Sequence, residues 1–134
     1  MSSVLAIILT IVSNLLPANV NQCTVIIAGD ELSFTRQNQN WSIEQVHRAE
    51  DKSIKKEFIG EYRVDGLDIY TKHNDHEHKV PANNLLGISN AKELKTLKQF
   101  TFGQDTLNLL HSDNSIYIKK DGKDLVKVNW DKPK

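Results

Sequence analysis

The stretch EYRVDGLDIY, residues 61–70, sets the fold class, because it carries a complete hairpin signal. Apolar and polar side chains alternate on both sides of Asp65-Gly66, a dipeptide typical of two-residue hairpin turns. That turn would place Arg63 opposite Asp68, as an ion pair across the two strands. The apolar face of this hairpin is predicted to consist of Phe58, Tyr62, Val64, Leu67 and Ile69.

Turn residues followed by short alternating strands recur along the chain, at residues 29–30, 103–105 and 121–122. At the last of these we expect a type I turn with Gly122 in a left-handed bulge, because that register separates apolar from polar side chains. The face so formed collects Ile116, Ile118, Val126, Val128 and Trp130. Further strands are predicted at residues 24–28, 32–36, 41–46, 67–72 and 107–111.

One short helix is predicted at residues 91–98, where Asn90 can cap the helix and Glu93 completes a capping box. The charged residues 48–56 are predicted to form a loop or a short helix. One helix among many hairpins predicts a mainly β fold, a small antiparallel β-barrel or sandwich, after an N-terminal signal segment. Because tight turns join most of the strands, we expect an up-and-down barrel.

The N-terminal segment, residues 1–29, contains no Lys, Arg, Asp or Glu. Its apolar run, residues 4–16, has the length of a signal-peptide core and is shorter than a membrane-spanning helix. Pro17 ends the run, and Ala18 is small enough to precede a cleavage site. The sequence therefore predicts a signal peptide at residues 1–18, a single β-rich domain at residues 19–134, and a secreted or periplasmic protein.

Two alternatives for this segment stay open: an uncleaved membrane anchor, and a buried strand or helix of a cytosolic protein. Cys23 also suggests a lipid-modified cysteine, although the three residues before it match a lipobox poorly. In the simpler interpretation Cys23 is a small buried apolar residue at the start of the first strand.

Composition limits the classes of partner. The chain has 17 basic and 17 acidic residues, all within residues 30–134, so the predicted domain is formally neutral. The chain has no excess of basic residues that would indicate binding to nucleic acid or to an anionic membrane surface. The remaining route to a membrane is an N-terminal anchor. A single cysteine excludes an intrachain disulfide, so packing must stabilise the domain.

The sharpest chemical pattern is KHNDHEH, residues 72–78, which holds three of the five histidines. If Asn74-Asp75 forms a two-residue turn, His73, His76 and His78 project from one face of a hairpin tip. Three imidazoles on one side suit Zn²⁺ or Cu²⁺, with a fourth position open to water. The simpler interpretation is a solvated hairpin tip that needs no cofactor.

Other candidate residues indicate structure rather than chemistry. His47 and His111 stand alone, and no nucleophile elbow or glycine-rich phosphate loop is present in the sequence. Trp41 and Trp130 are predicted to be core residues at strand ends. Asn40 begins a glycosylation sequon, which would matter only in a eukaryotic secretory pathway.

The sequence therefore predicts an exported, non-enzymatic binding or interaction domain. Its partner would be an apolar small molecule in a barrel interior, or another protein. The alternative is a metal-binding protein or metallohydrolase that uses His73, His76 and His78. A third hypothesis is a structural or cell-surface component without a ligand.

Overall fold

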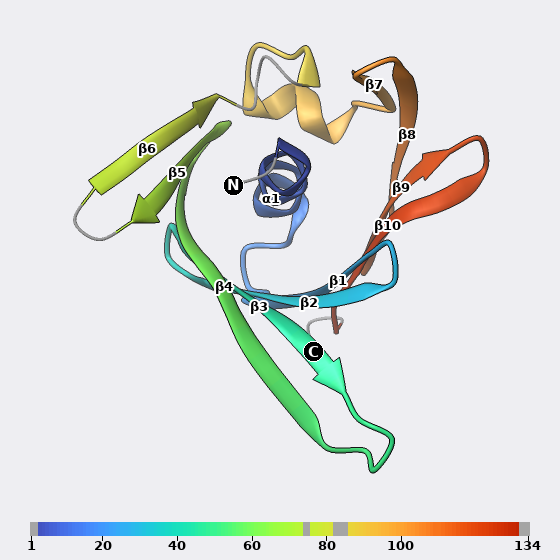
Figure 1. Cartoon of the computed structure of the whole chain (residues 1–134). Coiled ribbons are helices and arrows are strands. Elements are labelled where there is room, and N and C mark those ends of the chain that lie inside the picture. Colours follow the sequence, from blue (N-terminus) through green and yellow to red (C-terminus); the bar gives the residue numbers. More distant parts are fainter. Residues whose placement is uncertain (1–2, 74–75, 82–85, 132–134) are drawn as a thin grey trace.

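In the computed structural model, residues 3–73, 76–81 and 86–131 are described. Within them, ten antiparallel strands form one open sheet that curves around helix α1 (Ser3–Leu15), as Figure 1 shows. The strands are β1 (Gln22–Ile27), β2 (Asp30–Gln37), β3 (Asn40–Arg48), β4 (Ile54–Asp65), β5 (Asp68–His73), β6 (His76–Pro81), β7 (Gln99–Phe102), β8 (Asp105–His111), β9 (Ser115–Lys120) and β10 (Lys123–Asn129). The predicted mainly β class is confirmed.

The strand order in the sheet is β6-β5-β4-β3-β2-β1-β10-β9-β8-β7. Two meanders, β1–β6 and β7–β10, therefore meet where the first and last strands pair, with Thr24 opposite Asn129 and Ile27 opposite Val126. In the described part of the chain, β6 and β7 are the two edges of the sheet. The segment between them carries a short 3-10 helix, η1 (Ala91–Lys95), which lies beside α1 at the gap between the edges (Figure 1).

Helix α1 is buried on nearly all sides, which suits a segment without charges. Ala6, Leu9, Thr10 and Val12 have no exposed surface, and the Thr10 hydroxyl donates a hydrogen bond to the Ala6 carbonyl at 2.9 Å. A helix that is apolar all round is stable only when it is buried. Among the described residues, no helix has the length and apolar character needed to cross a membrane. The apolar run predicted as a signal core thus occupies the interior of this fold, and its export function stays a prediction.

The hairpin at residues 61–70 forms with a register different from the predicted one. Its two-residue turn is Gly66-Leu67, with Asp65 opposite Asp68, so the predicted turn at Asp65-Gly66 and the Arg63–Asp68 pair are wrong. Gly66 has φ +61°, a conformation that the first central residue of a tight hairpin turn needs and that glycine adopts without strain. Because the shift is two residues and side chains alternate with period two, the predicted faces survive, and Tyr62, Val64, Leu67 and Ile69 are buried.

Phe58 is the exception on that face. The register between β3 and β4 shifts after Ile43, so that Ile43 pairs with Gly60 but Glu44 pairs with Phe58. Ile59 is the extra residue of this β-bulge, and one extra residue inverts the faces of the strand beyond it. Beyond the bulge, residues 54–59 are exposed on both faces of β4, so Phe58 is 61% exposed and its predicted place in the core is wrong.

The C-terminal hairpin has the predicted apolar face but a different turn. Ile116, Ile118, Val126, Val128 and Trp130 are all buried. The turn is a two-residue turn at Asp121-Gly122, with φ +50° and +80°, and the bulge lies at Leu125 instead of at Gly122. Any register that gathers this apolar face needs one extra residue in the hairpin, and Leu125 supplies it inside β10.

The helix predicted at residues 91–98 is shorter and tighter than expected. It is η1, in which the backbone N–H of Glu93 donates to the Asn90 side chain at 3.3 Å, as predicted for the cap. The Glu93 carboxylate accepts from the backbone N–H of Ser89 at 3.0 Å. The charged segment at residues 48–56 is a turn between β3 and β4, and both strands extend into it.

Candidate functional site

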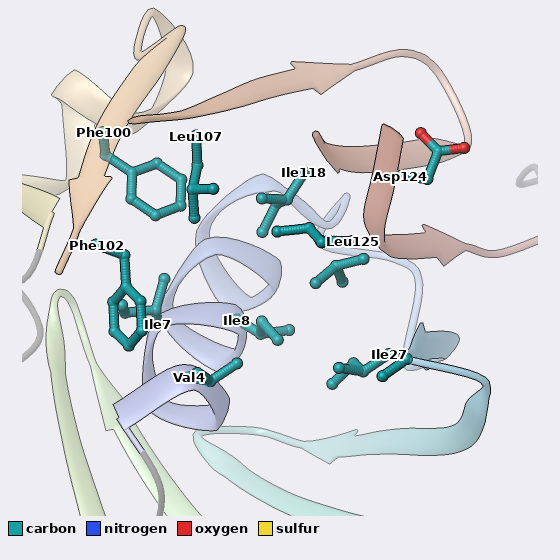
Figure 2. Close-up of a pocket in the computed structure, with 12 residues that line it drawn as sticks. Val4, Ile7, Ile8, Ile27, Phe100, Phe102, Leu107, Ile118, Asp124 and Leu125 are labelled. Carbon is teal, nitrogen blue, oxygen red and sulfur yellow. The ribbon is translucent and has the colours of Figure 1, made fainter. Parts of the chain in front are cut away.

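An apolar pocket of about 310 Å³ lies between α1 and the part of the sheet that β7–β10 form (Figure 2). This volume is at the lower end of the range for small-molecule sites in proteins. The pocket is lined by Val4, Ile7, Ile8, Ile27, Ala28, Phe100, Phe102, Leu107, Ile118, Asp124, Leu125 and Val126. In Figure 2 the apolar side chains converge from the helix and from the sheet on one space.

Strand alternation and one bulge place the sheet side of the pocket. Phe100 and Phe102 lie two residues apart on β7 and therefore share a face, and Leu107 pairs with Phe100 across the hairpin. On β10, Leu125 and Val126 both line the pocket although they are consecutive. Regular alternation forbids this, and the bulge at Leu125 permits it.

Asp124 is the one charged residue among the described residues that line the pocket. Its carboxylate lies 3.5 Å from Lys119 Nζ and 3.7 Å from Lys127 Nζ, and in Figure 2 it points away from the apolar side chains. The pocket interior is therefore formed by hydrocarbon groups. Such a surface binds an apolar group because it removes that group from water, and it has no polar group that would orient a polar bond of a ligand.

A cationic side chain lies where the chain leaves α1. The Arg36 guanidinium is half-buried, donates to the Pro17 carbonyl at 2.8 Å and to the Val20 carbonyl, and sits 5.2 Å over the Trp41 ring. Burial lowers the pKa of Arg36, and its electrostatic interaction with Cys23 opposes that change. Within the described residues, Arg36 forms no ion pair with a carboxylate. The partners of its side chain in this part of the molecule are two backbone carbonyl groups and the Trp41 ring.

The histidine hairpin has the predicted register. His73 pairs with His76, and Thr71 pairs with His78. The turn at Asn74-Asp75 and the side chain of His73 lie outside the described residues. His76 and His78 are exposed, and no group of three or more His, Cys, Asp or Glu side chains able to hold a metal ion is found in the described part of the chain. The zinc or copper site stays a prediction.

The isolated candidates have the structural roles expected of them. His47 lies on the surface 3.1 Å from Glu57 Oε2, and His111 is exposed with a ring nitrogen 3.4 Å from the Lys95 carbonyl. Trp41 and Trp130 are buried, as predicted. Cys23 is 2% exposed, and burial raises the pKa of its thiol to about 12, which confirms the buried apolar interpretation.

Sequence reasoning missed the pocket, and it kept a buried helix at residues 4–16 only as an alternative to the signal peptide. Phe100 and Phe102 lie on a four-residue strand, which is too short for its alternation to stand out. An apolar run of the length of residues 4–16 fits an export signal and a buried helix equally well, and periodicity does not separate them. Comparison of the chain with family models, with curated proteins and with solved structures found no match.

Proposed function

We propose that this chain is an exported, non-enzymatic binding domain that holds an apolar small molecule against the concave face of its sheet. The observation that carries the proposal is the sheet side of the apolar pocket beside α1, formed by side chains such as Phe102, Leu107 and Ile118, which would stay in the exported chain. A partially open apolar space in a small domain is costly to keep unless it is occupied. The curvature of the sheet supports describing the fold as an incomplete up-and-down barrel.

Export is the second element of this proposal. Its support is the charge-free run at residues 4–16 followed by Pro17 and Ala18. Mass spectrometry of the protein recovered from its native host tests it directly. We expect a chain that begins at Asn19, in a secreted or periplasmic fraction. A cytosolic chain that still contains residues 3–16 would overturn the export proposal.

Ligand binding is tested on the full chain with a fluorescent apolar probe and with palmitate as the competitor. We expect Leu107→Trp to weaken probe binding at least tenfold, because the indole fills the pocket from β8. Leu110→Trp is the matched control, since Leu110 lies on the same strand but is 47% exposed and outside the pocket. Equal probe affinity in both variants would exclude the pocket as the binding site.

A metal site is the second candidate, and the pairing of His73 with His76 favours it, because it puts these residues directly opposite one another. Calorimetric titration of the full chain with Zn²⁺ and with Cu²⁺ tests it. The triple substitution of His73, His76 and His78 by alanine should abolish submicromolar binding. Binding that survives the substitution places the metal elsewhere.

A further inference from the structure

Within the residues that the structure describes, the fold has one sheet, and α1 provides most of its second layer. Among the side chains that the structure describes, every strand except β6 contributes at least one buried apolar group to the core, β6 contributes the partly buried Val80, and these groups cluster with those of α1. A sheet that buries one face needs another layer to cover it. If residues 1–18 are removed on export, the concave face loses this cover and must be covered again.

The space that α1 occupies is long enough to hold a lipid chain. A helix of 13 residues is about 20 Å long and about 10 Å wide with its side chains. One leaflet of a bilayer core, which an acyl chain spans, is roughly 15 Å deep. Val4, Ile7 and Ile8 of the same helix line the apolar pocket. Removal of α1 would therefore join the pocket and the space of the helix into one groove.

Arg36 indicates the charge of the occupant. One of its two backbone acceptors, the Pro17 carbonyl, belongs to the segment that export would remove. The guanidinium would then have a free donor at the end of an apolar groove, still held in place by the Trp41 ring and the Val20 carbonyl. A half-buried guanidinium without a carboxylate partner favours an anionic group, to which it can donate two hydrogen bonds.

We propose that the concave face, once residues 1–18 have been removed, binds an anionic amphiphile, with its hydrocarbon chain in the space of α1 and its acid group on Arg36. This rests on the export element of the proposed function and deepens its binding element. Helix α1 is then the internal occupant of the ligand site until the chain has been processed.

The test starts from the folded full chain. A recognition site for a specific protease is inserted between Ala18 and Asn19, a dye is attached to the N-terminus, and the folded protein is cut. Palmitate and palmitoyl lysophosphatidic acid are added in separate arms, which distinguish a carboxylate from a phosphate headgroup. Hexadecanol, of the same chain length without an acid group, is the control ligand. Release of the labelled helix is followed by fluorescence anisotropy, and the species present by native mass spectrometry.

We expect the cut protein to exchange the labelled helix for one acidic amphiphile while keeping its β-sheet circular dichroism. Hexadecanol should displace the helix at least tenfold less well, because it lacks the charge-assisted contact. Arg36→Gln should weaken displacement by the acids roughly tenfold, and Arg36→Lys should restore part of it. If the cut Arg36→Gln protein retains its helix in buffer, the weaker displacement by the acids is not caused by unfolding.

Three results would overturn the proposal: a helix that stays bound at saturating amphiphile, a chain that unfolds when the helix leaves, or equal displacement by hexadecanol and palmitate. The proposed function fails separately. Probe binding to the uncut chain without helix exchange leaves the pocket function intact and removes this inference. Helix exchange without probe binding to the uncut chain supports the inference and removes the side pocket as a site.

Discussion

Strands β3 and β4 run through two environments that differ in what lies opposite them. At one end Trp41, Ile43 and Tyr62 are buried in the same core cluster as the side chains of α1; we refer to these three residues as the wall. Beyond the bulge, residues 46–58 project from the body of the molecule as a two-stranded arm, where Ile54 and Phe58 are 53% and 61% exposed (Figure 1). Both regions have apolar side chains in regular strands. Burial is decided by the presence of a second layer, not by the alternation of the strand.

The largest loss of stability should come from a charge placed in α1, the helix that covers the wall. Leu9→Asp puts a carboxylate on the fully buried side of α1, where no partner is available in the described structure, at a cost of about 4 kcal/mol or more. We expect the full chain to lose its cooperative urea transition, followed by far-UV circular dichroism. Val4→Asp is the control, because Val4 is 39% exposed in the first turn of the same helix, where an acidic residue is tolerated. Similar losses in both variants would show that α1 is not specifically packed.

The direct comparison of wall and arm uses two aromatic truncations. Trp41→Ala should lower the free energy of unfolding by about 3–5 kcal/mol, because it leaves a cavity beside the edge-packed ring of Phe34. Phe58→Ala should change it by less than about 0.5 kcal/mol, since its ring is solvated. Chemical denaturation of both variants measures the difference. A large loss for Phe58→Ala would mean that the arm is covered in solution.

A third comparison concerns the turns of the two regions. Gly66→Ala forces a side chain into a conformation with φ +61° and should destabilise the domain by about 1 kcal/mol. Lys52 already adopts φ +70° at the arm tip, so Lys52→Gly relieves strain and should be neutral or slightly stabilising. Thermal melting of both variants checks the opposite signs.

The smallest effect is expected at the base of the arm. Arg48 donates two hydrogen bonds to the Glu31 carboxylate, at 2.8 and 2.9 Å, and this lowers the pKa of Glu31. A carboxyl group with a lowered pKa in the folded state stabilises the fold above its unfolded-state pKa, and this contribution disappears as the pH falls through the folded-state value. Glu31→Gln should therefore reduce the Tm slightly at pH 7, by less than Gly66→Ala does, and not at all in strong acid. A Tm difference that persists at low pH would point to packing instead of charge.

The sequence was sufficient for those features that local patterns determine. The faces of the central and C-terminal hairpins, the burial of Trp41 and Trp130, and the pairing of His73 with His76 follow from alternation and turn residues. The faces of the central hairpin were predicted correctly although its register at Asp65-Gly66 was wrong, because a two-residue shift preserves the faces.

The features that failed depend on contacts between distant segments. The bulge at Ile59 has no local signal, so Phe58 was expected in the core. The apolar run at residues 4–16 could not be placed, because its burial depends on a sheet whose edges are more than 50 residues beyond it. The pocket follows from that placement and could not be foreseen without it.

The pairing of the first strand with the last has a mechanical consequence. Since β1 and β10 are antiparallel neighbours, the end of β1 that leads to the N-terminus and the end of β10 that leads to the C-terminus lie together, at Thr24 and Asn129. A force applied to the two ends of the domain acts across this pair of strands instead of along it. The hydrogen bonds between β1 and β10 then break one after another, beginning at Thr24, so the two strands separate at low force. The two meanders therefore come apart before either of them unfolds.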